Sequence, residues 1–145
     1  TNDMFGVMKV ALLTERISRD DPFPGTRPQP EDMLDDATLG SARAVGQEAH
    51  LGSLEVGKKA DLIVLDTQRA HLVPAGRIVS AWIHNGQPSD IESVMVDGQF
   101  VMRNREVLTM DEDSIIAEAD RVGRRIWSQV EAAGPITVPR LPRRR

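Results

Sequence analysis

The amino-acid sequence predicts a mixed α/β fold, and three observations carry that prediction. Residues 4–17 repeat apolar side chains at helical spacing behind the carboxylate of Asp3, which predicts a capped and largely buried helix. Residues 62–65 are an uninterrupted apolar run, and Asp97-Gly98 separates two β-prone runs in the manner of a tight hairpin. Residues 115–130 return to helical spacing, so a long helix should follow the sheet.

Breaker residues place the other helical segments. The prolines between residues 20 and 30 predict a loop, because proline removes a backbone donor and interrupts helices. A second helix is expected over residues 31–45, ending at Gly46, and a short one from residue 78 to His84.

Strand signals predict a small antiparallel meander. Strands are expected at residues 91–96, 99–102 and 106–108, and the run at residues 62–65, expected to be covered on both faces, can add to them.

The long helix has its own start and stop signals. Thr109 and Glu112 have the spacing of a capping box, and Pro135 should end the helix.

Length and charge exclude several classes of protein. The chain has 145 residues, a net charge of −4 and no cysteine, whereas a complete (β/α)8 barrel needs roughly 250 residues. The acidic balance argues against a nucleic-acid partner, and no apolar run is long enough to cross a membrane. We therefore expect a cytoplasmic protein without a membrane or nucleic-acid partner.

Few residues are candidates for chemistry. The three histidines, His50, His71 and His84, match no local metal-ligand spacing and are expected in connectors or at a helix end. Asp3 is interpreted as a helix cap, and Lys58 and Lys59 as solvated side chains of a turn. Trp82 and Trp127 are expected to be packing anchors, and the arginines of residues 140–145 to form a solubilising tail. The chain is thus predicted to hold no catalytic residue and no metal ligand.

Three blocks of sequence resemble one known family. They are ATLGSARAVG at residues 37–46, LGSLEVGKKADLIVLD at residues 51–66, and AWIHNGQPSDIESVMVDGQFVM at residues 81–102. In this order they resemble the carboxyl-terminal part of the amidohydrolase superfamily, in its branch of metal-dependent deaminases and chlorohydrolases.

The resemblance implies a fold in parts. Residues 1–50 would be the last helical elements of a (β/α)8 catalytic barrel. Residues 51–134 would supply part of a small β-sandwich-like domain, closed by the long carboxyl-terminal helix. Residues 135–145 would be a mobile basic tail.

The resemblance also implies a function for an intact enzyme. A divalent metal, zinc or iron, would activate water to hydrolyse a C–N or C–Cl bond of a nitrogen heterocycle such as an aminopurine or a triazine. This small-molecule substrate would lie near Asn2, whereas the metal ligands would come from an upstream barrel segment or a second chain. The intact enzyme would be a homo-oligomer. The alternative is a non-catalytic binding or structural module derived from the same fold.

Overall fold

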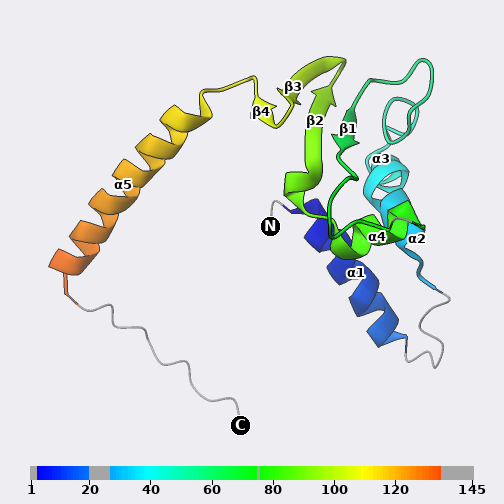
Figure 1. Cartoon of the computed structure of the whole chain (residues 1–145), viewed down its shortest axis with the longest axis horizontal. Helices are drawn as coiled ribbons and strands as arrows, with labels where there is room; N and C mark the ends of the chain where they lie inside the picture. The colour runs from blue at the N-terminus through cyan, green and yellow to red at the C-terminus, as the bar shows by residue number, and fades with distance from the viewer. Residues whose placement is uncertain (1–2, 20–26, 75, 135–145) are drawn as a thin grey trace, which may run out of the picture. The chain divides into compact units, whose positions relative to one another are not determined.

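The computed structural model describes residues 3–19, 27–74 and 76–134. The chain divides into two compact units, Thr1–Thr109 (unit 1) and Met110–Arg145 (unit 2), and each is considered by itself. Unit 1 contains several helical segments and a four-stranded sheet, and unit 2 contains one long helix (Figure 1). The predicted mixed α/β character is confirmed.

The first helix, α1, spans Met4–Ser18 as predicted. Asp3 caps it, because its Oδ1 accepts a hydrogen bond of 3.0 Å from the backbone N–H of Gly6. Phe5, Met8 and Leu12 are buried one turn apart on a single face. The helix is less buried than expected, since its other large apolar residues are exposed; these are Met4, Val7, Val10, Leu13 and Ile17.

The second helical stretch is continuous but not uniform. It consists of α2 (Pro30–Asp35), the π-helical segment η1 (Asp36–Gly40) and α3 (Ser41–Ala44). Gln29 and the side chain of Asp32 form the cap, with 2.7 Å between the Gln29 N and Asp32 Oδ2. Helix formation over residues 31–45 is confirmed, whereas the π segment had no signal in the sequence.

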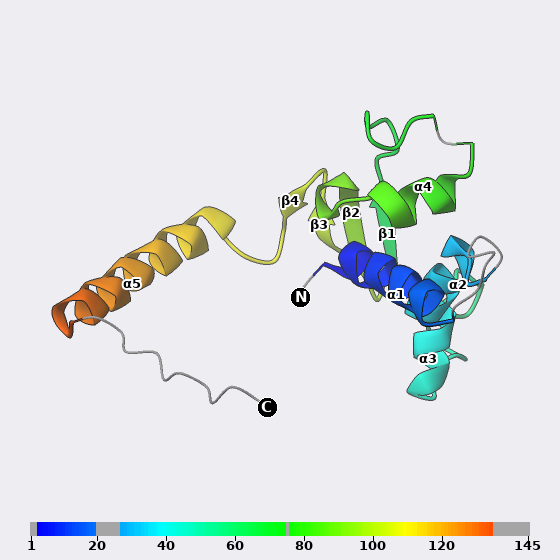
Figure 2. The ribbon, with the colours of Figure 1, turned by 90° about the horizontal axis from the view of Figure 1, so that it is seen from below.

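The core of unit 1 lies where the helices meet one end of the sheet (Figures 1 and 2). Helix α4 (Ile78–Asn85) contributes Ile83 to this core and α2 contributes Met33. The core residues are Phe5, Met8, Leu12, Met33 and Ile83, with Ala37, Leu65, Val79, Trp82 and Ile91 packed against them. Leu65 ends the first strand and Ile91 begins the second, so the sheet reaches the helices through these two strand ends.

The sheet is an antiparallel meander in the order β1-β2-β3-β4. Its strands are β1 (Leu62–Leu65), β2 (Ile91–Val96), β3 (Gln99–Arg103) and β4 (Glu106–Val107); the 3₁₀ turn η2 (Pro88–Asp90) precedes β2. Asp97 and Gly98 have φ angles of 51° and 81°, as a two-residue hairpin turn requires. The predicted meander and its hairpin are confirmed.

Strand β1 differs from the sequence prediction in its surroundings. It is an edge strand, and Ile63 and Val64 on its two faces are 44% and 41% exposed. The expected cover on both faces is therefore absent among the described residues. A continuous apolar run indicates which side chains favour burial, but burial also requires other elements that pack on both faces of the strand.

Gly52 joins two of the three sequence blocks in space. Its φ is +90°, and a Cβ at this position would lie 2.8 Å from the Leu39 Cα and 2.9 Å from the Ala42 Cβ. Any larger side chain would push the turn away from η1 and α3. The glycine of the second block is thus the contact by which the turn packs on the helix of the first block.

Unit 2 consists of α5, Glu112–Ala132. The capping-box prediction is wrong, because Asp111 and not Thr109 caps the helix: its Oδ1 accepts a hydrogen bond of 3.0 Å from Ser114 N. Aspartate is an equally favoured cap and adds negative charge at the positive end of the helix dipole. Pro135 lies outside the described residues, and the helix ends earlier, at Ala132, before Gly134 with φ +90°.

No residue of α5 is buried. The expectation that Trp127 anchors packing is not met within the described residues, because this side chain is 63% exposed. Helical periodicity correctly identified the face of the helix, but a face becomes a packing surface only when another element covers it.

Among the described residues, no helix combines the length and apolar character that crossing a membrane demands.

Candidate functional site

An open groove runs along the helical layer of unit 1. It has a volume of about 740 Å³ and lies between α1 and the stretch formed by α2, η1 and α3. Its apolar lining comes from Met4, Val7, Met8, Ala11, Met33 and Ala37. Met4, Val7 and Ala11 follow one another at helical spacing, on a different face of α1 from the buried residues.

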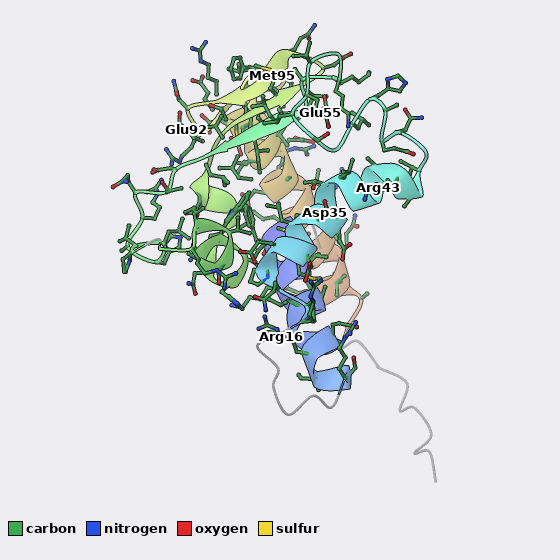
Figure 3. The ribbon with its side chains drawn as sticks, turned by 90° about the vertical axis from the view of Figure 1, so that its right-hand side faces the viewer. Arg16, Asp35, Arg43, Glu55, Glu92 and Met95 are labelled. Atoms are coloured by element: carbon green, nitrogen blue, oxygen red, sulfur yellow. The ribbon has the colours of Figure 1, made fainter. Side chains whose placement is uncertain are left out.

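Four charged residues that line this groove form two ion pairs. Arg19 lies 2.6 Å from Glu15, and Arg27 lies 3.8 Å from Asp32. Arg16, labelled in Figure 3, donates two hydrogen bonds of 3.1 and 2.9 Å to the backbone oxygen of Pro28. An apolar lining whose charged neighbours are already paired suits packing by another apolar segment better than binding of a polar small molecule.

A second candidate is a polar network at the end of the sheet. Asp90 is 1% exposed, and its Oδ2 lies 2.8 Å from His71 Nε2 and 2.9 Å from the backbone N–H of Gln87, which donates to it. The same end of the sheet holds Asp66, directly after β1, whose backbone N–H donates to the Asp90 carbonyl at 2.8 Å. The two carboxylates therefore flank the point where β1 and β2 enter the core.

The Asp90 carboxylate is held in its charged form. Burial by itself raises the pKa of Asp90, but hydrogen bonds from His71 and Gln87, together with nearby positive charge, outweigh it and hold the pKa below its usual range. A buried carboxylate with two donors is a satisfied structural group, and its partners explain why it is tolerated in the core.

Asp66 is held by positive charges from two directions. Arg105 donates a hydrogen bond of 2.9 Å to Asp66 Oδ2, and the Nε of Arg69 lies 3.1 Å from the same oxygen as an ion pair without hydrogen-bond alignment. The hydrogen bond from the backbone N–H of Gln68, followed by Arg105 and Arg69, lowers the pKa of Asp66. This network ties β1, the following loop and the β3–β4 turn together, which is a structural role.

Sequence reasoning missed this network. His71 was placed in a connector, which is correct, but its partner Asp90 and the group of Asp66, Arg69 and Arg105 were not singled out. The available signal was position: Asp66 directly follows one strand and Asp90 directly precedes the next, and antiparallel neighbours bring such ends together.

The other predicted residues have mostly structural places. His84 lies in the last turn of α4, as expected, and His50 lies in a turn, where its carbonyl accepts a hydrogen bond from Lys59 N at 2.9 Å. Trp82 packs on Phe5 with 5.5 Å between ring centroids, so its role as a packing anchor is confirmed. Asn2 and the arginines of residues 140–145 lie outside the described residues.

Lys58 differs from its expected solvated state. Its side chain is only 12% exposed, and its Nζ donates to Ser53 Oγ at 2.6 Å and lies 3.2 Å from Glu55 Oε1. Figure 3 labels Glu55 in this turn. Hydrogen bonding from Ser53 and then Lys58 lowers the pKa of Glu55. Lys59 is more exposed and lies 3.4 Å from Asp97. Lys58 thus stabilises the glycine-bracketed turn through its contacts with Ser53 and Glu55 in the same turn.

The described residues do not fit a catalytic metal. Across residues 3–19, 27–74 and 76–134, no three side chains of histidine, aspartate or glutamate come together in the way a metal site requires. Asp3 accepts the capping hydrogen bond of α1, and His71 is hydrogen-bonded to Asp90.

Comparison with known proteins decides the family. The model of the amidohydrolase family matches residues 1–101. The chain belongs to the amidohydrolase family. The resemblance of its three sequence blocks is thereby confirmed.

The relatives are much longer than the chain. A 5-methylthioadenosine/S-adenosylhomocysteine deaminase of Desulforudis audaxviator is 36% identical over 130 residues, which cover 88% of the chain and 29% of the relative. A zinc-bound adenosine deaminase of Xanthomonas campestris superposes with a TM-score of 0.78 at 30% identity, covering 86% of the chain and 28% of the enzyme. A zinc complex of atrazine chlorohydrolase from Arthrobacter aurescens superposes with a TM-score of 0.71 at 26% identity, covering 81% of the chain and 25% of the enzyme. The chain thus spans under a third of these amidohydrolases.

Proposed function

We propose that this chain is the carboxyl-terminal portion of a metal-dependent amidohydrolase that hydrolyses a C–N or C–Cl bond of a nitrogen heterocycle. The observation that carries the proposal is the structural likeness to a zinc-bound adenosine deaminase over 86% of this chain but only 28% of that enzyme. Because the described residues do not fit a metal site, the zinc or iron would be held by residues outside this chain.

Uncovered apolar surfaces support this placement. The exposed apolar side chains of α1 would be buried by a packing neighbour, and the open edge of β1 could pair with another strand. The described residues provide neither. In the proposed enzyme, residues 1–50 end the catalytic barrel and α1 packs against it. Residues 51–134 then contribute to the small β-domain, including α5, and residues 135–145 form the tail.

The names of the relatives support a substrate class. One acts on 5-methylthioadenosine and S-adenosylhomocysteine by its name, and another is an atrazine chlorohydrolase. We propose an aminopurine or a triazine as the substrate, with Asn2 near the rim of its site. From the family alone, we also propose that the intact enzyme is a homo-oligomer.

Reassembly of the enzyme tests the proposal. The chain should be co-expressed with the segment encoded upstream of it, and the purified complex assayed for release of ammonia from adenosine or 5-methylthioadenosine and of chloride from atrazine. We expect metal-dependent release of one of the two in the complex, abolished by a chelator and restored by zinc or iron. Failure of the two segments to bind each other would contradict the proposal.

The isolated chain supplies the matched control. It should hold no stoichiometric zinc or iron by elemental analysis, because a catalytic site needs converging ligands. One tightly held metal per chain, lost when Asp3 and one histidine are replaced together, would overturn the assignment of the metal to another segment.

The non-catalytic module remains the second candidate, since unit 1 has a core of its own. A compact monomer that unfolds cooperatively and binds little hydrophobic dye would favour the module over the enzyme portion.

A further inference from the structure

The last turn of α4 ends in the dipeptide Asn85-Gly86. An asparagine followed by a glycine is chemically labile, because the backbone nitrogen of the glycine can attack the carbonyl carbon of the asparagine side chain. Glycine favours this attack, since it has no side chain to hinder the approach and its backbone reaches a wide range of dihedral angles. Asn85 is therefore a candidate site of covalent modification.

The reaction needs no reagent other than water. The backbone nitrogen of Gly86 forms a bond to the Cγ atom of Asn85, and the bond between Cγ and the side-chain nitrogen breaks. That nitrogen leaves as ammonia, taking up the proton that the Gly86 nitrogen loses, and the product is a cyclic succinimide. Water then opens the ring at either carbonyl group, which gives aspartate or isoaspartate at position 85.

In the folded chain the attacking nitrogen is held in place. The backbone N–H of Gly86 donates a hydrogen bond of 2.7 Å to the carbonyl oxygen of Trp82, which closes the last turn of α4. Attack requires this nitrogen to lose its proton and Asn85 to leave its helical backbone conformation. The same turn is anchored in the core by Ile83, which is 1% exposed. Ring closure thus requires local opening at the end of α4.

The space around Gly86 does not fit the isoaspartate product. A Cβ at Gly86 would lie 2.5 Å from Trp82 Cδ1 and 3.2 Å from Phe5 Cδ1, and closer still to the carbonyl oxygen of Trp82. Trp82 packs on Phe5 with 5.5 Å between ring centroids, where α4 lies beside α1 (Figures 1 and 2). Isoaspartate adds a carbon atom to the backbone just before Gly86. Gly86 would therefore be displaced where no added atom fits.

Both products also add a negative charge at the end of α4. The carbonyl groups at the carboxyl end of a helix carry partial negative charge, so a carboxylate is unfavourable there. Aspartate at position 85 adds this charge alone, whereas isoaspartate adds the charge and displaces Gly86. The two products should therefore differ in their effect on stability.

We propose that Asn85 is a site of spontaneous deamidation controlled by the end of α4. The folded helix blocks the reaction, local opening permits it, and isoaspartate then prevents the packing of Trp82 on Phe5 from forming again. The modification thus converts a reversible opening into an irreversible loss of part of the core. This inference depends only on residues of unit 1, and it stands or falls independently of the proposed hydrolase activity.

Peptide mapping by mass spectrometry gives the first test. The 145-residue chain is incubated at mildly alkaline pH, in buffer and in guanidinium chloride, and the rate of deamidation at Asn85 is measured. We expect the rate in buffer to be at least about tenfold lower, because opening of the helix end breaks a hydrogen bond and separates packed rings. Asn104 is the internal control, since the side chain of Arg105 hinders attack and should keep its rate low in both solutions. Equal rates at Asn85 in the two solutions, or no reaction there in guanidinium chloride, would overturn the proposal.

A variant that loosens α4 tests whether the helix end sets the rate. Ile83→Ala removes a buried side chain, so the rate at Asn85 in buffer should rise about tenfold or more, towards the rate in guanidinium chloride. In guanidinium chloride the variant and wild type should react alike. The matched control is Ile63→Ala on β1, where the side chain is 44% exposed, and its rate should stay within about twofold of wild type. A lower melting temperature in Ile83→Ala without faster deamidation would contradict control by α4.

Refolding of modified chains tests the fate of the product. Chains aged in guanidinium chloride are returned to buffer, and the isoaspartate form is separated from the aspartate form. The isoaspartate form should melt about 4 °C or more below Asn85→Asp, or fail to refold, because only isoaspartate displaces Gly86. An isoaspartate form with the same melting temperature as Asn85→Asp would reject the proposed irreversible loss of packing.

Discussion

Helices α1 and α5 are both amphipathic, but only α1 has buried residues. Phe5, Met8 and Leu12 of α1 pack with Met33 and Ile83, whereas no residue of α5 is buried. Yet α5 separates its apolar and charged faces more sharply than α1 does. The clarity of an amphipathic pattern therefore does not decide burial. Burial requires a second element with a matching surface.

The largest expected effect contrasts one residue from each helix. Leu12 is 0% exposed, so Leu12→Ala should lower the free energy of unfolding by about 2–5 kcal/mol through lost burial and a cavity. Ile126 is half exposed, so Ile126→Ala should change it by less than about 0.5 kcal/mol. Urea unfolding of both variants gives the two values. Equal losses would show that α5 packs as firmly as α1.

The polar network should be the next most sensitive feature of unit 1. Asp90→Ala leaves the Gln87 N–H and the His71 ring without their acceptor, at a cost of about 1–3 kcal/mol. Asp35→Ala is the control, because Asp35 is exposed on α2 (Figure 3). Equal melting temperatures for the two variants would show that the buried carboxylate contributes little to stability.

The hairpin and α5 offer a comparison between two glycines. Gly98 has a φ of +81°, so Gly98→Val should cost about 1–2 kcal/mol of backbone strain, whereas Gln99→Thr next to it should be tolerated. At Gly123 there is open space and helical backbone, so Gly123→Ala should stabilise α5 by about 0.5–1 kcal/mol. An unchanged melting temperature for Gly98→Val would refute the turn assignment.

The smallest expected effect is a dependence on pH. The folded pKa of Asp90 is lowered, so its ionisation contributes stability that is fully present above its unfolded pKa of about 3.9. That contribution is lost as the pH falls below this value and through the folded pKa. The difference in unfolding free energy between wild type and Asp90→Asn should therefore shrink as the solution is acidified below about pH 4. A difference that stays constant would mean that Asp90 is not stabilised as a carboxylate.

Local signals in the sequence were sufficient to predict most helices and strands of this chain. Helical spacing located α1, α4 and α5, and the Asp97-Gly98 turn located the β2–β3 hairpin, because these signals depend on side chains that are neighbours along the chain. The sequence also identified the family through its three blocks. Where two local signals competed, at the start of α5, sequence reasoning chose Thr109 and the structure uses Asp111.

Which of these surfaces are in contact depends on how the whole chain folds. Neither the pairing of His71 with Asp90 nor the packing of Gly52 against Leu39 and Ala42 can be read from spacing, because each joins segments that meet only after the chain has folded. The exposure of Ile63 and Trp127 has the same origin. Periodicity states which face of an element is apolar, but the free energy of burying that face is realised only when another element covers it.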